Sequence, residues 1–187
     1  LQTPDGGYMV VGTTFQTEGT ISDREIMIIK TDEFGRELDH SPMLYGTSGH
    51  DYGYKVVPAG NGGYVIAGSS KQGSNTFGYI IKINSNGEKV FEHTVGTTPL
   101  QEFMAITACD DGGFILTGYS KETTGDKQVY LVKTDSWGLT VWERVIGFTD
   151  FNDVGEAVIE HNGRIIITGS TAPVTTASGN SRLLILN

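Results

Sequence analysis

The stretch DDGGFILTGYS at residues 110–120 decides the fold, because near copies of it stand at three other places in the chain. They read DGGYMVVGTT at 5–14, NGGYVIAGSS at 61–70 and NGRIIITGST at 162–171. The glycine that ends each apolar run lies at position 12, 68, 118 or 169, which gives spacings of 56, 50 and 51 residues. Such a regular period predicts a repeat architecture in which each copy is one structural unit.

Three further phrases recur with the same rhythm. One reads MIIKTDEFG at 27–35, YIIKINSNG at 79–87, YLVKTDSWG at 130–138 and LLILN at 183–187. Another ends in Gly46, Gly96 and Gly147, and the last reads GYKVVPAG at 53–60, FMAITACD at 103–110 and GEAVIEHN at 155–162. Each unit is therefore four short segments rich in β-branched, aromatic and aliphatic residues. Asn-Gly and Asp-Gly between them supply the positive φ that hairpin turns need, so we expect four antiparallel strands per unit.

The repeat predicts an all-β fold, an arc of about four β-propeller blades with four strands each. A β-solenoid coil would not need two antiparallel hairpins per unit, and the nearly continuous apolar runs indicate strands covered on both faces. We place the blades at 1–46, 47–96, 97–147 and 148–187, within a single domain. The first lacks its first segment and the last lacks its fourth, so these two cannot complete each other. We hypothesise that the arc is part of a larger propeller, whose remaining blades or another copy of the chain cover its ends.

The phrases DGGYMVVG, IMIIKTDEFG and YGTSGHDYGYKVV also resemble the repeats of bacterial and archaeal secreted β-propeller proteins. The resemblance covers essentially the whole chain in four copies. The fourth copy departs from it, because EHNGRII lacks the second glycine and the aromatic residue, and LLILN lacks the lysine and the turn. This resemblance implies an extracellular or cell-surface location, as a repeat module inside a longer protein. It implies no common enzymatic activity.

Charge and cysteine content exclude several classes of function. Thirteen basic and 22 acidic residues leave a formal charge of −9, which argues against a nucleic-acid partner and against docking on an anionic membrane. No apolar run approaches the ~20 residues of a membrane span. Cys109 is the only cysteine, so an internal disulfide and a multi-cysteine zinc site are both excluded.

Binding residues are expected on the longer connections, because variable loops over a rigid scaffold commonly carry function. We expect such loops at 13–25, 69–78, 120–128 and 170–182, and at 45–53, 95–103 and 146–155, all on one face of the arc. For any single loop, a solvated connector is the alternative interpretation. The candidate ligand-face residues are His50, Asp51, Tyr52, Asp150 and Asp153.

One acidic stretch is a candidate for calcium. Its oxygen ligands stand at nearly alternate positions, as calcium prefers, but without the spacing of an EF-hand loop. These residues are Asp150, Asn152, Asp153 and Glu156. A surface carboxylate cluster is the default interpretation, so the sequence predicts no cofactor.

Two polar positions, a lysine and an aspartate or asparagine, recur in the third segment of the repeat. The lysines Lys30, Lys82 and Lys133 are interpreted either as a cationic ring for an acidic ligand or as structural residues that pair with a nearby carboxylate. Repetition in each unit favours the structural role. The residues Asp32, Asn84, Asp135 and Asn187 are expected to open a hairpin turn through their side chains.

No catalytic residue is predicted, because the four histidines fall in different segments without a local triad or a zinc motif. The sequence favours a non-enzymatic extracellular or cell-surface module for protein or glycan binding, or for surface assembly. The alternative is part of a propeller-fold polysaccharide hydrolase or lyase. Since propellers host both classes, the fold does not decide between them.

Overall fold

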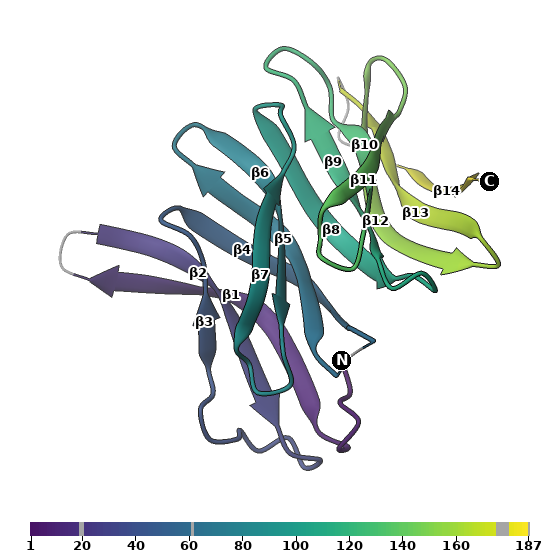
Figure 1. The fold of residues 1–187 in the computed structure, drawn as a ribbon. Helices are drawn as coiled ribbons and strands as arrows, with labels where there is room; N and C mark the ends of the chain where they lie inside the picture. The colour runs from purple at the N-terminus through teal and green to yellow at the C-terminus, as the bar shows by residue number, and fades with distance from the viewer. Residues whose placement is uncertain (19–20, 61, 175–179, 187) are drawn as a thin grey trace.

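The computed structural model describes residues 1–18, 21–60, 62–174 and 180–186, and gives the side chains of all these residues except 16–18, 21–22 and 180–186. This described part is all β and contains fourteen strands (Figure 1). None of it forms a helix with the length and apolar character needed to cross a membrane. Asn187, the expected fourth turn-opening residue, lies outside it.

The strands follow one another in the order that the repeat predicts. The first sheet holds β1 (Tyr8–Glu18), β2 (Ile21–Thr31) and β3 (Met43–Tyr45). The second unit holds β4 (His50–Pro58), β5 (Tyr64–Gln72), β6 (Asn75–Ile83) and β7 (Lys89–Val95). The third holds β8 (Leu100–Ala108), β9 (Phe114–Lys121), β10 (Gln128–Thr134) and β11 (Thr140–Ile146). The fourth holds β12 (Phe151–His161), β13 (Arg164–Pro173) and β14 (Asn180–Leu186).

The fold is a partial β-propeller, an open arc of antiparallel meanders, as the sequence predicts. We name the strands of a unit A to D in chain order. The second and third units are complete, and their A strands lie nearest the centre of the arc. These two units join through one parallel pair, Thr76 with Leu100, and otherwise form separate four-stranded blades. In Figure 1 the sheets lie side by side in the order of the chain, from β1 at one end to β14 at the other.

The first unit is slightly more complete than expected. Leu1 and Met9 exchange two backbone hydrogen bonds, and Gln2 forms a β-bridge with Tyr8. Leu1 and Gln2 are therefore the last two residues of a strand A beside β1. The sequence prediction assigned no segment to this position.

The glycine pairs of the repeated phrase have two different roles. The first glycine, for example Gly62, has a positive φ of 84° and makes the hairpin turn between strands A and B. The second glycine, for example Gly63, lies against the neighbouring strand, where a Cβ would collide with the carbonyl oxygen of Ile83. The same two features occur in the first and third units, so the doubled glycine is needed for backbone geometry in each.

The turns between strands C and D are closed by the predicted side chains. The Asp135 carboxylate accepts hydrogen bonds from the backbone N–H groups of Trp137 and Leu139, both at 2.9 Å. Asp32 and Asn84 accept the equivalent pairs of bonds in the first and second units. This prediction is confirmed for the three described copies.

The connections between strands B and C differ from the prediction of long loops. In the second unit β5 and β6 pair without interruption as far as Gln72 with Asn75, so only Gly73 and Ser74 form the turn. In the first unit β1 and β2 pair as far as Glu18 with Ile21. Serine, threonine and glutamine follow the apolar run at these ends, and their backbones continue the antiparallel ladder into solvent. The face opposite the tight turns therefore carries protruding hairpins as well as loops.

Three apolar clusters lie between successive sheets and hold the arc together. The cluster between the second and third units contains Val65, Ile80, Phe103, Leu116 and Tyr130, among others. Phe103 stacks on Tyr130 with ring centroids 5.7 Å apart, and it fills the space above Gly78, where any side chain would collide with its ring. Each sheet is thus covered by its neighbour, which explains why the apolar runs are nearly continuous.

Candidate functional site

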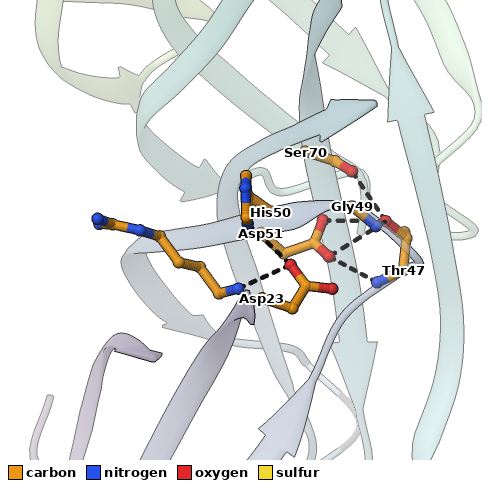
Figure 2. A network of polar contacts seen from close by, with 7 residues as sticks. Asp23, Thr47, Gly49, His50, Asp51 and Ser70 are labelled. Atoms are coloured by element: carbon orange, nitrogen blue, oxygen red, sulfur yellow. Dashed lines mark hydrogen bonds and ion pairs between the residues drawn. The ribbon is translucent and has the colours of Figure 1, made fainter. Parts of the chain in front are cut away.

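We call the face of the arc that carries the B–C connections and the connections between units the loop face. The buried Asp51 lies on this face at the start of β4, and Figure 2 shows its hydrogen-bond network, which braces this face. Its carboxylate is 0% exposed and accepts hydrogen bonds from the backbone N–H of Thr47 at 2.6 Å and from the Thr47 hydroxyl at 3.1 Å. The Thr47 hydroxyl lies 3.1 Å from that of Ser70 and accepts a bond from the Gly49 N–H. Burial raises the pKa of Asp51, and the nearby negative charge of Asp23 raises it further, although the bonds from Ser70 and Thr47 lower it.

The same brace occurs at the equivalent position of the next two units. The Gln101 side chain accepts a hydrogen bond from the Thr98 N–H at 3.2 Å, and the Asp153 carboxylate accepts one from the Phe148 N–H at 2.8 Å. Both side chains are buried. Because all three residues satisfy the loop that leads into their own strand, we assign Asp51 and Asp153 to the scaffold.

His50, unlike Asp51, is at the surface and points to the first unit. Its Nδ1 lies 2.9 Å from a carboxylate oxygen of Asp23, which also accepts the backbone N–H of Arg24 (Figure 2). The Arg24 guanidinium lies 5.6 Å from the centroid of the Tyr52 ring. The structure therefore brings the candidate residues His50 and Tyr52 together with Arg24 and Asp23 at one junction of the loop face.

The four calcium candidates form hydrogen bonds with four different residues. The Asp150 N–H bonds to Asp126, and the Asn152 side-chain oxygen accepts the Lys127 N–H. Asp153 serves the brace described above, and Glu156 accepts the Ser170 hydroxyl at 2.8 Å. Among the residues that the structure describes, no group of three or more His, Cys, Asp or Glu side chains is placed to hold a metal ion.

A groove of about 560 Å³ opens on the loop face between the second and third units. We call it the loop-face groove. Strands β4 and β8 form its floor, and the connections β5–β6 and β9–β10 form its sides. Its lining includes Tyr52, Tyr54, Lys71, Glu102, Lys121 and Glu122.

Two tyrosines and a carboxylate dominate the floor of the loop-face groove. Tyr52 and Tyr54 point to the same side of β4, with their rings nearly parallel at 7° and their centroids 6.4 Å apart. The Tyr54 hydroxyl donates to Glu102 on β8 at 3.4 Å. Burial raises the pKa of Tyr54, and the Glu102 charge raises it further. The same two causes, in the same order, raise the pKa of Tyr119 on β9, which places a second phenol beside this carboxylate.

This cluster breaks the repeat, whereas the braces obey it. The residues equivalent to Tyr54 are Met104 and Glu156, and those equivalent to Glu102 are Tyr52 and Val154. Tyr119 corresponds to Ser69 and Ser170. A scaffold residue is needed in every unit, but a binding site is needed once, so departures that converge in one groove point to a site. The chemistry there is an aromatic platform beside a carboxylate and two lysines.

The repeated lysines lie on the opposite side of the arc and have separate structural partners. Lys133 forms an ion pair with Asp111 at 2.8 Å, Lys30 donates to the Ser85 carbonyl at 3.2 Å, and the Lys82 ammonium lies over the Phe91 ring. They form no shared cationic ring. Cys109 is also on this side, and burial raises the pKa of its thiol to about 12, which keeps it protonated and unreactive at neutral pH.

Comparison with known proteins supports the fold. No family model matches the chain, and a search of curated proteins gives no match. Among solved structures, a mutant of the GH32 β-fructofuranosidase BmSUC1 from Bombyx mori, in complex with sucrose, is similar with a TM-score of 0.56 and 9% sequence identity. The alignment covers 96% of this chain and 45% of that one, so this chain spans less than half of the enzyme's length. At this identity the likeness shows the propeller fold alone.

Sequence reasoning found only part of the loop-face groove. It singled out Tyr52, but it did not point to Glu102 or to the two lysines. These residues lie 48 or more positions from Tyr54 or on the far side of a turn, so no local motif joins them. The available signal was the comparison of units position by position, which shows where the repeat is broken.

Proposed function

We propose that this chain is an extracellular or cell-surface propeller module that binds a glycan in the loop-face groove. The observation that supports this is the convergence of Tyr52, Tyr54 and Glu102, which depart from the repeat, in one open groove. A sugar ring offers an apolar C–H face and a rim of hydroxyls. Parallel phenol rings can stack on the apolar C–H face, and carboxylate and ammonium groups can form hydrogen bonds with the hydroxyls.

The lining of the groove agrees with a binding role. Ligand sites are concave, with apolar and aromatic walls and a few polar groups that fix the orientation of the ligand. Lys71 of the second unit lines the groove together with Glu102 and Lys121 of the third unit. Groups from two units are therefore available to one ligand.

A glycan-binding assay with two groove variants tests this proposal. Tyr54→Ala removes half of the aromatic platform and Glu102→Gln removes the carboxylate charge. We expect each to weaken binding on a glycan array and in calorimetry by about tenfold, which corresponds to about 1.4 kcal/mol. Met104→Ala is the matched control, because Met104 holds the Tyr54 position of the next unit and does not line the groove. An equal loss in the control, or no glycan bound by the parent chain, would contradict the proposal.

A second candidate is part of a polysaccharide hydrolase or lyase. It is favoured by the fold similarity to a β-fructofuranosidase and by the placement of Glu102 between two tyrosines. Glycosidases of the usual kind need a pair of carboxyl groups, one acting as an acid and the other as a base or nucleophile. Release of reducing ends from the bound glycan, abolished in Glu102→Gln, would select this candidate over simple binding.

A further inference from the structure

A pocket of about 350 Å³ lies between the third and fourth units, and we call it the inter-unit pocket. Its walls come from β10, β11, β12 and β13 and from the connection between the two units. They include Val129, Ile146, Phe148, Asp153, Ile167 and Thr171. The pocket shares no lining residue with the loop-face groove, so the two sites can be tested separately.

The apolar part of the pocket occupies a place that an aromatic ring fills between the second and third units. There the Phe103 ring covers Gly78, and it packs in one cluster with Val95 and Leu116. The residues at the positions of these three neighbours are Val129, Ile146 and Ile167, and all three line the inter-unit pocket. The position of Phe103 itself is held by Gly155, which has no side chain to fill the space.

The junction between the first and second units shows a second way to fill this place. Gly53 stands there at the Phe103 position, and a Cβ on it would collide with the Ile26 side chain, which is 0% exposed. At the position of Ile26 the third unit has Val129, which is smaller and only half-buried. Neither solution is therefore present between the third and fourth units, and the inter-unit pocket is the space that remains.

A buried hydroxyl in the pocket has no hydrogen-bond partner among the residues that the structure describes. It belongs to Thr171, which is 3% exposed. Thr171 follows Ile167 by four residues on β13, so its side chain is on the face of the strand that packs on the third unit. A buried polar group without a partner is rare, because it loses its bonds to water and gains none in return.

The second unit shows which group Thr171 lacks. There the Thr47 hydroxyl lies 3.1 Å from the Ser70 hydroxyl and 3.1 Å from a carboxylate oxygen of Asp51. Asp51 and Ser70 are opposite each other on β4 and β5, and Asp153 and Thr171 are opposite each other on β12 and β13. The two groups that a bridging hydroxyl joins are therefore present in the fourth unit as well.

The bridging hydroxyl itself is replaced in the fourth unit. Phe148 donates its backbone N–H to Asp153, as Thr47 does to Asp51, but a phenylalanine side chain has no hydroxyl. The third unit keeps the threonine, because the Thr98 hydroxyl lies 3.0 Å from its serine partner. Only the fourth unit combines an unpartnered hydroxyl with an unfilled apolar space within the described ranges of the chain.

We propose that the inter-unit pocket binds a small apolar alcohol or phenol, with a compact hydrocarbon body and one hydroxyl group. The ligand hydroxyl donates to the Asp153 carboxylate and accepts the Thr171 hydroxyl, which replaces the threonine bridge of the other units. The body of the ligand lies among Val129, Ile146 and Ile167. An apolar cavity of about 150 Å³ holds benzene, so this larger pocket has room for a single ring with its hydroxyl.

A titration with phenol, followed by NMR spectroscopy, tests the proposal. Toluene is the matched probe, because it keeps the ring and the size of phenol but has no hydroxyl. We expect phenol to shift the methyl resonances of Val129 and Ile167 to saturation, and to bind about tenfold more tightly than toluene. Thr171→Val keeps the size of the side chain and removes its hydroxyl, so it should weaken phenol binding by about fivefold and leave toluene binding unchanged.

Two further variants control for the place of binding. Val129→Phe puts a ring into the pocket and should abolish the binding of both probes. Ser120→Ala removes the equivalent hydroxyl of the third unit, which already has a partner, and should change neither affinity.

Thermal unfolding without any ligand gives an independent reading of the hydroxyl. Thr171→Val should raise the midpoint by roughly 2–4 °C, because it removes a buried hydroxyl that makes no bond. Ser120→Ala should lower the midpoint, because it breaks an existing bond.

Three results would overturn the proposal. Phenol that does not bind, or that binds no better than toluene to the parent chain, would show that the pocket does not recognise a hydroxyl. Shifts that persist in Val129→Phe would place the binding elsewhere. A lower midpoint in Thr171→Val would show that an ordered water molecule already satisfies this hydroxyl.

Discussion

At the scale of single residues, the buried brace at position 51 carries a charge that the protein environment opposes. Gln101 performs the same task in the next unit with a neutral amide, so the charge is not required for the hydrogen bond to the loop. The Thr47 N–H needs an acceptor at this place, because a buried N–H without one is costly. The hydrogen bond at this position therefore needs the oxygen of the side chain and not its ionisation.

The raised pKa of Asp51 gives a specific pH dependence of stability. Because the folded state holds this proton more tightly than the unfolded state, the contribution of Asp51 to the free energy of unfolding falls as the pH rises above its usual value of 3.8. The loss is complete once the pH passes the folded pKa. Urea unfolding between about pH 3 and 7 should show that Asp51→Asn removes this decline.

Asp111 supplies a control of opposite sign. Its bond with Lys133 is the largest of the causes that lower its pKa, so its stabilising contribution is present above 3.8 and is lost as the pH falls through the folded value. Asp111→Asn should therefore reduce stability at neutral pH more than at low pH. If both variants changed the pH profile in the same direction, the assignment of the buried charge to Asp51 would be wrong.

At the scale of elements, the turn between strands C and D does more than reverse the chain. In the described part of the chain, the turns of the second and third units each pack on strand D of the preceding unit. Gly138 lies against the Phe91 ring and His93, whose Nε2 is 3.0 Å from the Trp137 carbonyl. Gly87 lies in the same way against Met43, and the Tyr45 hydroxyl donates to its carbonyl. The turn is thus a repeated contact between blades.

A matched pair of substitutions isolates this contact. Gly138→Ala and Gly35→Ala both introduce a side chain at a positive φ, 75° and 78° respectively, so each should cost about 1–2 kcal/mol of backbone strain. Of the two, only Gly138 has neighbours within 4 Å, on β7 of the preceding unit, so its variant should lose roughly a further 1–3 kcal/mol from overpacking. Urea unfolding measures both values, and equal costs would show that the turn adds nothing to the packing between blades.

At the scale of the whole molecule, the outer face of the first sheet is exposed in the part of the chain that the structure describes. On the first sheet, Val10 is 52% exposed, whereas its equivalents Ile66 and Leu116 are both 0% exposed. Tyr8 on the same face is 43% exposed, against 6% for Tyr64 in the second unit. The side chains of β1 that point the other way, such as Met9, pack on the second unit. The exposed face has the composition of a surface that another blade covers.

We therefore expect the isolated chain to self-associate through its end faces. Sedimentation velocity over a range of concentrations should show oligomers, and Val10→Lys should weaken their association by about tenfold or more, since it would bury a charge. Val141→Lys is the control, because Val141 is 61% exposed but lies on the outer strand of a complete unit. A chain that stays monomeric at high concentration and unfolds cooperatively would contradict the view that the arc belongs to a larger assembly.

The repeat by itself determined the strand order, the sheet type and the places of the tight turns. These features are local, because Asp-Gly and Asn-Gly turns and apolar runs act within a few residues. Each repeat carries the same signals, so the structure of one unit predicts that of the others. The length of the hairpins beyond the apolar runs was missed, since polar residues continue a ladder without an apolar signal, as from Ser69 to Gln72.

Only the tertiary structure decided which polar residues support the fold and which are available to a ligand. Asp51 and Tyr52 are neighbours in sequence, yet one is buried in a brace and the other lines the loop-face groove. Successive side chains of a strand point to opposite faces, so their roles depend on what the adjoining blade places opposite them. The meeting of Tyr54 with Glu102, 48 residues later, likewise depends on blade packing. No single repeat carries that information, because each unit is completed by its neighbour.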